Sequence, residues 1–218
     1  GTSPAKDNST YLETTTENIG TNTSEITTNV HKVATNVGTI TNNGERKADG
    51  TNSNPTSGTV QENNDTGMIT NNYGTVNTNG GTGTPTISNN YGLVKENTNF
   101  GTVQNNQAGG IVENNKAGGT IQSNSGLMGE EGQYGNLITT GTSGNYGIVT
   151  NNNPGGEVCN REGGEVTNNY RDGSVYNDGG TVTNNWGRVT NNSGTGVNDS
   201  ADGAVRSNSR TETNNSGT

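Results

Sequence analysis

The sequence predicts an all-β protein: a β-solenoid, or parallel β-helix, of short strands with Asn and Gly at the corners. Composition is the first observation, because 41 Asn, 37 Thr and 36 Gly make up just over half of the 218 residues. The second observation is that Leu, Ile, Val and Phe contribute only 30 residues, which is too few for a helix bundle or a doubly wound enzyme. The third observation is a short repeated unit, which a disordered chain has no reason to keep.

The repeated unit is Gly, any residue, Val or Ile, and then Asn three residues after the aliphatic. One copy starts at Gly92, with Val94 and Asn97, and the next starts at Gly101 with Val103. Successive aliphatics lie nine residues apart from Val94 to Ile121 and seven apart from Val175 to Val189. Val, Ile and Thr favour strands, and Asn and Gly accept positive φ, so each unit predicts a short strand followed by a bend.

One aliphatic side chain per strand cannot form a core alone. Stacked coils place each aliphatic on that of the next coil, pair the backbone amides at about 4.8 Å, and stack the corner Asn side chains into ladders. Val94, Val103, Val112 and Ile121 are therefore expected in a common buried file. Two units per coil give roughly 16–18 residues per turn and three give roughly 22–26, and the sequence leaves both open.

The chain divides into three predicted regions. Residues 58–218 carry the solenoid repeats, with an irregular insertion near 127–146. Residues 45–57 form a linker, and residues 1–44 form an N-terminal capping or oligomerising segment, since a terminal coil exposes an unpaired edge.

Residues 12–43 repeat every seven residues, and this segment has two interpretations. The candidate oligomerisation heptad comprises Ile19, Asn22, Ile26, Asn29, Val33, Asn36 and Ile40. Aliphatic and Asn core positions are typical of a helical coiled coil, whereas the many Thr residues favour strands or an irregular cap. Ile19-Gly20-Thr21-Asn22-Thr23 resembles the heptads of trimeric autotransporter adhesin stalks. That resemblance implies a parallel trimer whose inward Asn side chains can hold an anion.

The chain offers little material for catalysis. It has one histidine, His31, and one cysteine, Cys159. We expect His31 to be solvated and Cys159, next to the inward Val158, to point outward as a free thiol. Asp172 and Asp178 precede glycines and leave a calcium site open, although turn chemistry explains both pairs. We therefore predict no enzyme activity, no cofactor and no metal site.

Aromatic residues are the candidate binding residues. Six of them directly precede a glycine, one being Tyr134 in the insertion, so they could stack in a row along one edge of the solenoid. The other five are the candidates: Tyr73, Tyr91, Phe100, Tyr146 and Trp186. Such a row protects a corner, forms a subunit interface or binds glycans.

The sequence resembles Asn-, Gly- and Thr-rich solenoids of bacterial surfaces, filaments or phage fibres. That resemblance implies an extracellular, cell-surface or virion location and a non-enzymatic structural or adhesive role. The expected partner is the chain itself, as a homotrimer or an end-to-end polymer, with surface glycans as a further candidate. With a net charge of −9, nucleic acid is not expected as a partner, and neither is membrane insertion.

Two alternatives remain: a phage fibre that recognises glycans, and an ice-binding solenoid. Thr181-Val182-Thr183 has the outward Thr pair that an ice plane requires, and the chain is similar to plant ice-binding solenoids, with Gly and Asn in reversed order. Other units replace the second outward Thr, with Lys95, Gln104, Glu113, Gln122 and Arg206.

Overall fold

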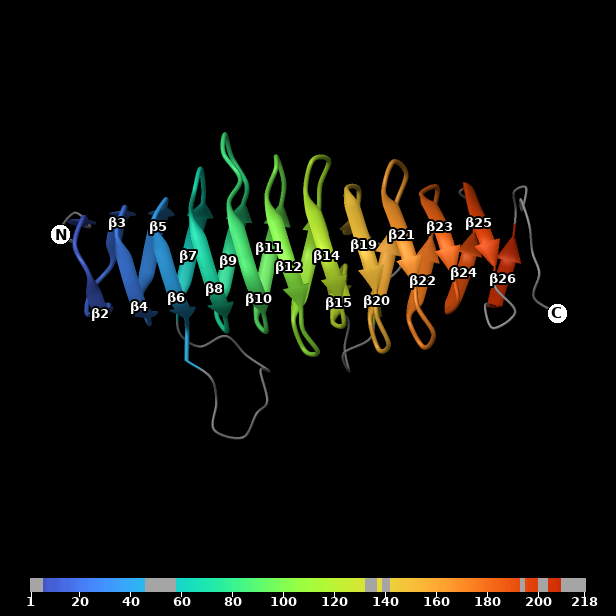
Figure 1. The fold of residues 1–218 in the computed structure, drawn as a ribbon, viewed down its shortest axis with the longest axis horizontal. Helices are drawn as coiled ribbons and strands as arrows, with labels where there is room; N and C mark the ends of the chain where they lie inside the picture. The colour runs from blue at the N-terminus through green and yellow to red at the C-terminus, as the bar shows by residue number, and fades with distance from the viewer. Residues whose placement is uncertain are drawn as a thin grey trace.

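A computed structural model describes residues 6–45, 58–131, 137–138, 142–192, 195–199 and 204–208. These residues form a β-solenoid, in which successive strands follow one another along the long axis (Figure 1). The described part of the chain contains no helix. The predicted fold class is confirmed.

Two parallel sheets make up the walls of the solenoid. Within the described residues, the 13-stranded sheet A contains β1 (Lys6–Asn8), β3 (Ile19–Asn22), β5 (Lys32–Asn36), β7 (Thr59–Asn63), β9 (Thr75–Asn79), β11 (Leu93–Asn97), β13 (Ile111–Asn115), β15 (Leu127–Met128), β18 (Gly144–Asn145), β20 (Glu157–Asn160), β22 (Ser174–Asn177), β24 (Arg188–Asn192) and β26 (Ala204–Asn208). The 11-stranded sheet B contains β2 (Leu12–Thr14), β4 (Glu25–Asn29), β6 (Thr39–Asn43), β8 (Met68–Asn72), β10 (Thr86–Asn90), β12 (Thr102–Asn106), β14 (Thr120–Asn124), β19 (Ile148–Asn152), β21 (Glu165–Asn169), β23 (Thr181–Asn185) and β25 (Thr195–Asp199).

Each coil contributes one strand to sheet A and then one to sheet B, so a coil holds two repeat units. Val94 of β11 pairs in register with Val76 of β9 on one side and with Val112 of β13 on the other. The three-unit alternative is therefore wrong. Coils differ in length through their corners: 18 residues separate Val76 from Val94, and 14 separate Ile19 from its partner Val33.

The core consists of two facing files of side chains. Sheet A supplies Ile19, Val33, Val60, Val76, Val94, Val112, Met128, Val158, Val175 and Val189, and sheet B supplies Ile26, Ile40, Ile69, Ile87, Val103, Ile121, Val149, Val166 and Val182. Val94, Val103, Val112 and Ile121 are all fully buried as predicted. They alternate between the two files rather than sharing one, because neighbouring units lie in opposite sheets.

Two buried ladders of Asn side chains flank this apolar core. Ladder A runs through Asn8, Asn22, Asn36, Asn63, Asn79, Asn97, Asn115, Asn145, Asn160 and Asn177, and ladder B through Asn29, Asn43, Asn72, Asn90, Asn106, Asn124, Asn152, Asn169 and Asn185. At every step Nδ2 donates to Oδ1 of the next coil at 2.7–2.8 Å. No buried side-chain N or O atom of the described residues lacks a hydrogen-bond partner, so these amides are buried without the penalty of an unpaired polar group.

The coiled-coil interpretation of residues 12–43 is wrong. Ile19 and Val33 belong to the core file of sheet A, whereas Ile26 and Ile40 belong to that of sheet B. Asn22 and Asn36 lie in ladder A, and Asn29 and Asn43 in ladder B. The seven-residue spacing is half of a 14-residue coil, which imitates a heptad.

Both sheets continue from these first coils into the later ones. Strand β5 pairs with β7, and β6 pairs with β8. The linker predicted between them, residues 45–57, lies outside the described residues except for Glu45.

The glycine of the repeated unit is required by a close approach between coils. A Cβ placed on Gly92 would lie 2.3 Å from the carbonyl oxygen of Gly74 in the preceding coil, which is far inside van der Waals contact. The φ of Gly92 is not positive, unlike that of Gly109, which lies one residue before the repeat glycine Gly110. The expectation that the repeat glycine is needed because its φ is positive is therefore wrong at Gly92.

The irregular insertion interrupts one strand of sheet A. Met128 of β15 occupies the core file, and Asn145 of β18 occupies ladder A. Between them the chain leaves the sheet and forms the antiparallel pair β16 (Glu130–Glu131) and β17 (Leu137–Ile138). Strand β17 contacts β20 of the following coil.

Candidate interaction surfaces

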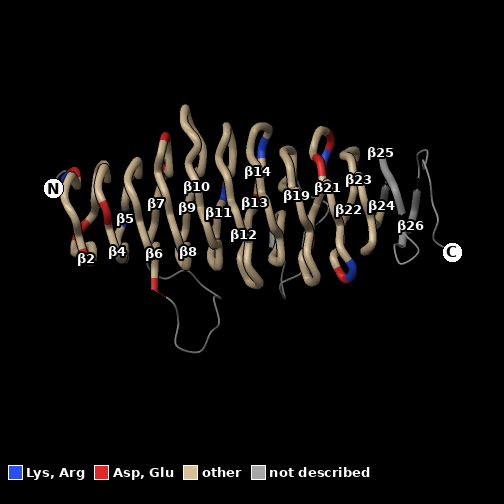
Figure 2. Tube along the Cα trace, viewed as in Figure 1, with Lys and Arg blue, Asp and Glu red and all other residues tan. Residues whose placement is uncertain are grey.

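The outer faces of the two sheets differ in charge. Strands β5–β24 of sheet A carry the charged residues Lys32, Glu62, Lys95, Glu96, Glu113, Glu157 and Arg188, whereas strands β4–β23 of sheet B carry only Glu25 and Glu165. Figure 2 shows how sparse the charges are along the tube. Sheet B therefore presents a long face of neutral polar groups.

Rows of hydroxyl and amide side chains cover this face of sheet B. The third residue of each strand from β4 to β23 in sheet B follows the inward aliphatic and lies on the outer face. These residues are Thr27, Thr41, Thr70, Ser88, Gln104, Gln122, Thr150, Thr167 and Thr183. Of the residues that interrupted the Thr pattern in the sequence, Lys95, Glu113 and Arg206 belong to sheet A. Only Gln104 and Gln122, both neutral, fall on sheet B, so the Thr face is more regular than the sequence indicated.

A further set of Asn side chains lines the outside of sheet B. Asn184 donates to Asn168, and Asn168 donates to Asn151, both at 2.9 Å. Asn89 likewise donates to Asn71 at 3.2 Å. In this outer ladder each Nδ2 donates to the preceding coil, opposite to the direction of the buried ladders.

The five candidate aromatics lie on two opposite edges of the solenoid, so the predicted single row is wrong. Corners from sheet B to sheet A form the B-to-A edge, at the bottom of Figure 1, and corners from sheet A to sheet B form the A-to-B edge, at the top. Tyr73, Tyr91 and Trp186 lie on the B-to-A edge, and Phe100 and Tyr146 lie on the A-to-B edge.

Ring stacking accounts for the aromatics of the B-to-A edge. Tyr73 and Tyr91 stack with centroids 5.1 Å apart and an interplanar angle of 15°. Trp186 stacks on Tyr170 at 5.6 Å and 14°, a partner that the sequence analysis missed because Tyr170 does not precede a glycine. Such pairs stabilise adjacent corners. Phe100 has no stacked partner among the described rings and is 66% exposed.

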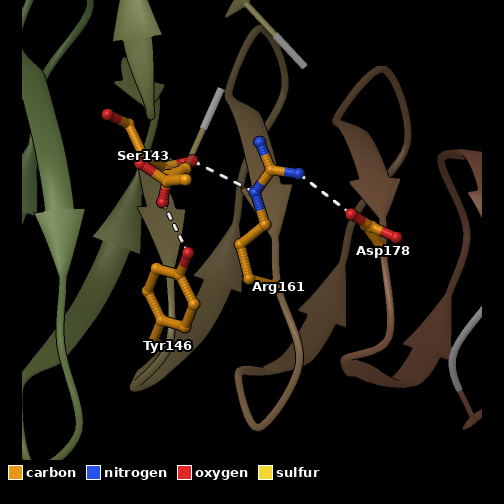
Figure 3. A network of polar contacts seen from close by, with 5 residues as sticks. Ser143, Tyr146, Arg161 and Asp178 are labelled. Carbon is orange, nitrogen blue, oxygen red and sulfur yellow. Dashed lines mark hydrogen bonds and ion pairs between the residues drawn. The ribbon is translucent and has the colours of Figure 1, made fainter. Parts of the chain in front are cut away.

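Tyr146 belongs to a polar network at the end of the insertion (Figure 3). Its hydroxyl donates to the carbonyl oxygen of Thr142. In the next coil, Arg161 Nε donates to the carbonyl oxygen of Ser143 at 3.2 Å, and Arg161 Nη1 pairs with Asp178 Oδ2 at 3.0 Å. The Arg161 side chain is only 8% exposed, so this network fixes the point at which the insertion rejoins sheet A.

The surroundings of Asp172 and Asp178 give no support to a calcium site. Asp178 pairs with Arg161, and Asp172 occupies a corner with φ of 65°. No group of three or more His, Cys, Asp or Glu side chains that could hold a metal ion occurs within the described ranges.

Cys159 is buried, contrary to the prediction of an exposed thiol. It lies between the inward Val158 and Asn160, and the insertion strand β17 packs against its strand. Tyr176 of β22 is its register partner in the following coil. Burial raises the pKa of the Cys159 thiol, and the neighbouring Arg161 offsets part of that increase. His31 is exposed as expected.

One notch on the B-to-A edge has an apolar floor. The tight corner Ser125–Gly126 lies between two longer corners, 107–110 and 153–156, and the resulting cavity has a volume of about 330 Å³. Its lining comprises Ala108, Gly109, Gly110, Ile111, Ser125, Gly126, Leu127, Pro154, Gly155 and Glu157. The sequence signal for it is the unequal length of consecutive corners.

Comparison with known protein families, with curated protein sequences and with solved structures found no match to this chain. Within the part of the chain that the structure describes, no helix is long and apolar enough to cross a membrane.

Proposed function

We propose that the protein is an extracellular, non-enzymatic rod that serves as a structural or adhesive building block. The observation that supports this function is the coupling between coils. Among the described residues, successive coils are joined by parallel backbone pairing in both sheets, and between Asn29 and Asn177 also by Asn–Asn hydrogen bonds in both buried ladders. A solenoid held in this way behaves as a one-dimensional array whose neighbours stabilise one another. Such an array suits a stalk or spacer.

The neutral outer face of sheet B supports the adhesive part of the proposal. Hydroxyl and amide groups donate and accept hydrogen bonds without the desolvation cost of charges. Cell-surface glycans, which present hydroxyl groups, are therefore the expected adhesive partners.

Beads that display the chain test this function under flow. We expect them to be retained on glycan-coated surfaces, and a variant with Lys in place of Thr41, Thr70 and Thr150 should be retained less. The matched control places Lys at Gln61, Asn77 and Thr190 of sheet A, and it should retain binding. Equal release of coated and bare beads from all surfaces would contradict an adhesive role.

Ice binding is the second candidate, and the Thr pairs of sheet B favour it. Thr39 and Thr41 flank the inward Ile40, and Thr181 and Thr183 flank Val182. Adjacent coils repeat these groups at about 4.8 Å on a parallel sheet, which gives the regular lattice that an ice plane requires. At the first strand position, Met68 and Ile148 replace Thr with an uncharged side chain, and Glu25 and Glu165 replace it with a carboxylate.

Ice recrystallisation assays separate the two candidates. The ice-binding function predicts inhibition at micromolar protein, lost in the Thr41, Thr70 and Thr150 Lys variant and kept in the sheet A control. Large ice grains with the wild-type chain would remove this candidate and leave the adhesive function intact.

A further inference from the structure

We propose that copies of this chain associate edge to edge, with Phe100 of one copy seated in the notch around Ser125–Gly126 of the next. This inference rests on the proposed function as a building block and names the contact that would join the blocks. Phe100 is the single Phe of the sequence. It is 66% exposed at a corner of the A-to-B edge, where its ring contributes nothing to the core.

The backbone at Phe100 argues against a purely local role for this residue. Phe100 has φ of 63°, and Asn99 before it has φ of 43°. Both values lie in the left-handed region, which a bulky residue rarely adopts. Five other corners place a Gly with positive φ directly before the repeat glycine, namely Gly109, Gly118, Gly155, Gly163 and Gly179, and one further corner places the smaller Asp172 there. A strained residue held where Gly fits better indicates a function for its side chain.

The notch matches an aromatic ring in size and polarity. A cavity of about 150 Å³ lined by apolar side chains is enough to hold benzene, and the notch measures about 330 Å³. Leu127 and Ile111 form apolar parts of its lining, and Ala108 and Pro154 stand on the two longer corners beside it. Burial of the ring there would remove the most exposed large apolar side chain of the described residues from water.

The positions of ring and notch define the geometry of association. The ring lies on the A-to-B edge and the notch on the B-to-A edge, so a single translation brings one copy's ring to its neighbour's notch. Phe100 lies between β11 and β12, and the notch corner lies after β14, one coil further. The copies are therefore staggered by about one coil, or ~4.8 Å.

Charges agree with the same stagger. Lys116, which pairs with Glu96 of its own chain at 2.7 Å, lies one coil after Phe100 on the A-to-B edge, and Glu157 follows the corner one coil after Ser125–Gly126. A translation that seats Phe100 in the notch therefore brings Lys116 of one copy toward Glu157 of the neighbour. Opposite charges at the rim of a contact fix its register. Because each copy keeps a free ring on one edge and a free notch on the other, the contact is heterologous and extends into an open ribbon.

Two single variants test the contact from its two sides. Phe100→Gly removes the ring and suits the left-handed backbone, so folding should be retained or improved while association weakens by at least about tenfold. Ala108→Glu places a carboxylate in the notch and should weaken association similarly. Tyr11→Ala is the matched control, because Tyr11 is an equally prominent aromatic, 60% exposed, on the same edge. Sedimentation velocity over a concentration series, with circular dichroism to confirm folding, measures each effect.

A mixing experiment tests the heterologous geometry. Phe100→Gly keeps its notch and Ala108→Glu keeps its ring, so an equimolar mixture should form one-to-one dimers that do not grow further. The double variant should stay monomeric. Electron microscopy of the wild-type chain should show ribbons, and the mixture should show pairs.

Wild-type protein that sediments as a monomer at all concentrations would overturn the inference, as would normal assembly of Phe100→Gly. Loss of glycan binding in Phe100→Gly with unchanged assembly would assign the ring to a sugar instead, which also overturns it. Retention of coated beads without self-association rejects this contact alone, whereas self-association without retention rejects the adhesive function alone.

Discussion

The side-chain amide of Asn97 donates to Oδ1 of Asn115, one coil further along the chain, at 2.7 Å. Asn79 donates to Asn97 in the same way at 2.8 Å. Each ladder Asn thus serves one neighbour as acceptor and the other as donor, so removal of one amide affects three coils.

Asn97→Ala should therefore destabilise the fold strongly. Asn79 loses an acceptor and Asn115 loses a donor, and each buried group left unpaired costs about 1–3 kcal/mol. Urea unfolding measures the loss. The control is Asn114→Ala, since Asn114 makes only an exposed hydrogen bond, at 3.4 Å, to the carbonyl oxygen of Lys95, and its effect should stay within about 0.5 kcal/mol. Equal losses for the two variants would show that the buried ladder does not stabilise the coils.

Truncation of a core aliphatic should cost more than truncation of a surface one in the same sheet. Ile87 is fully buried in the file of sheet B, and Ile148 is 42% exposed. We expect Ile87→Ala to lower the free energy of unfolding by about 2–5 kcal/mol and Ile148→Ala to change it by about 0.5 kcal/mol. Thermal and urea denaturation of both variants check the contrast, and a mild effect at Ile87 would speak against a tightly packed file.

Two glycine substitutions separate close approach from backbone conformation. In Gly92→Ala the new Cβ meets the Gly74 carbonyl oxygen at 2.3 Å, so two coils must move apart at a cost of about 1–3 kcal/mol. In Gly163→Ala the Cβ meets nothing within 4 Å, but φ is +84°. That strain of roughly 1–2 kcal/mol is partly offset by the lower entropy of the unfolded chain. Gly92→Ala should therefore have the lower melting temperature, and the reverse order would count against close approach as the reason for the repeat glycine.

The buried thiol of Cys159 should make stability fall at alkaline pH. Its pKa is raised by burial, so the unfolded chain releases the thiol proton at a lower pH than the folded chain does. Stability is then unchanged below the ordinary thiol pKa and decreases as pH rises above it. Urea unfolding across alkaline pH measures this slope, which Cys159→Ala should lack.

Thiol-specific reagents provide the companion measurement. We expect modification of Cys159 in the folded chain to be slow and to accelerate in urea. Fast labelling of the native chain would contradict the burial of Cys159.

The period of the sequence predicted the interior well. Val94 and Asn97 recur at fixed offsets, and the inward side chains of a stacked structure must repeat with the coil. The outer faces were less predictable, because Lys95 and Gln104 occupy the same offset in the unit yet lie in different sheets. The number of repeat units per coil determines which sheet each unit belongs to. The sequence did not reveal that number, because the corners differ in length.

The remaining errors come from long-range contacts. Cys159 alternates outward from Val158 as a strand requires, yet it is buried, and no local signal marks the contact of its strand with β17. The stack of Tyr170 on Trp186 joins residues 16 apart through the coil. The left-handed backbone of the candidate residue Phe100 did have a signal in the sequence. Asn99-Phe100-Gly101 stands where the next corner along the chain reads Ala108-Gly109-Gly110.

The two kinds of Asn ladder in sheet B run in opposite senses, and this has a consequence for the dipole moment of the molecule. Amide dipoles that all point one way add up to a dipole moment that grows with every extra turn. The outer row, with Asn184 donating back to Asn168, counters the inner row, in which Asn169 donates forward to Asn185. Where both rows are present, their dipoles oppose one another, so an added turn on this side contributes less to the dipole moment of the whole molecule than the inner row alone would.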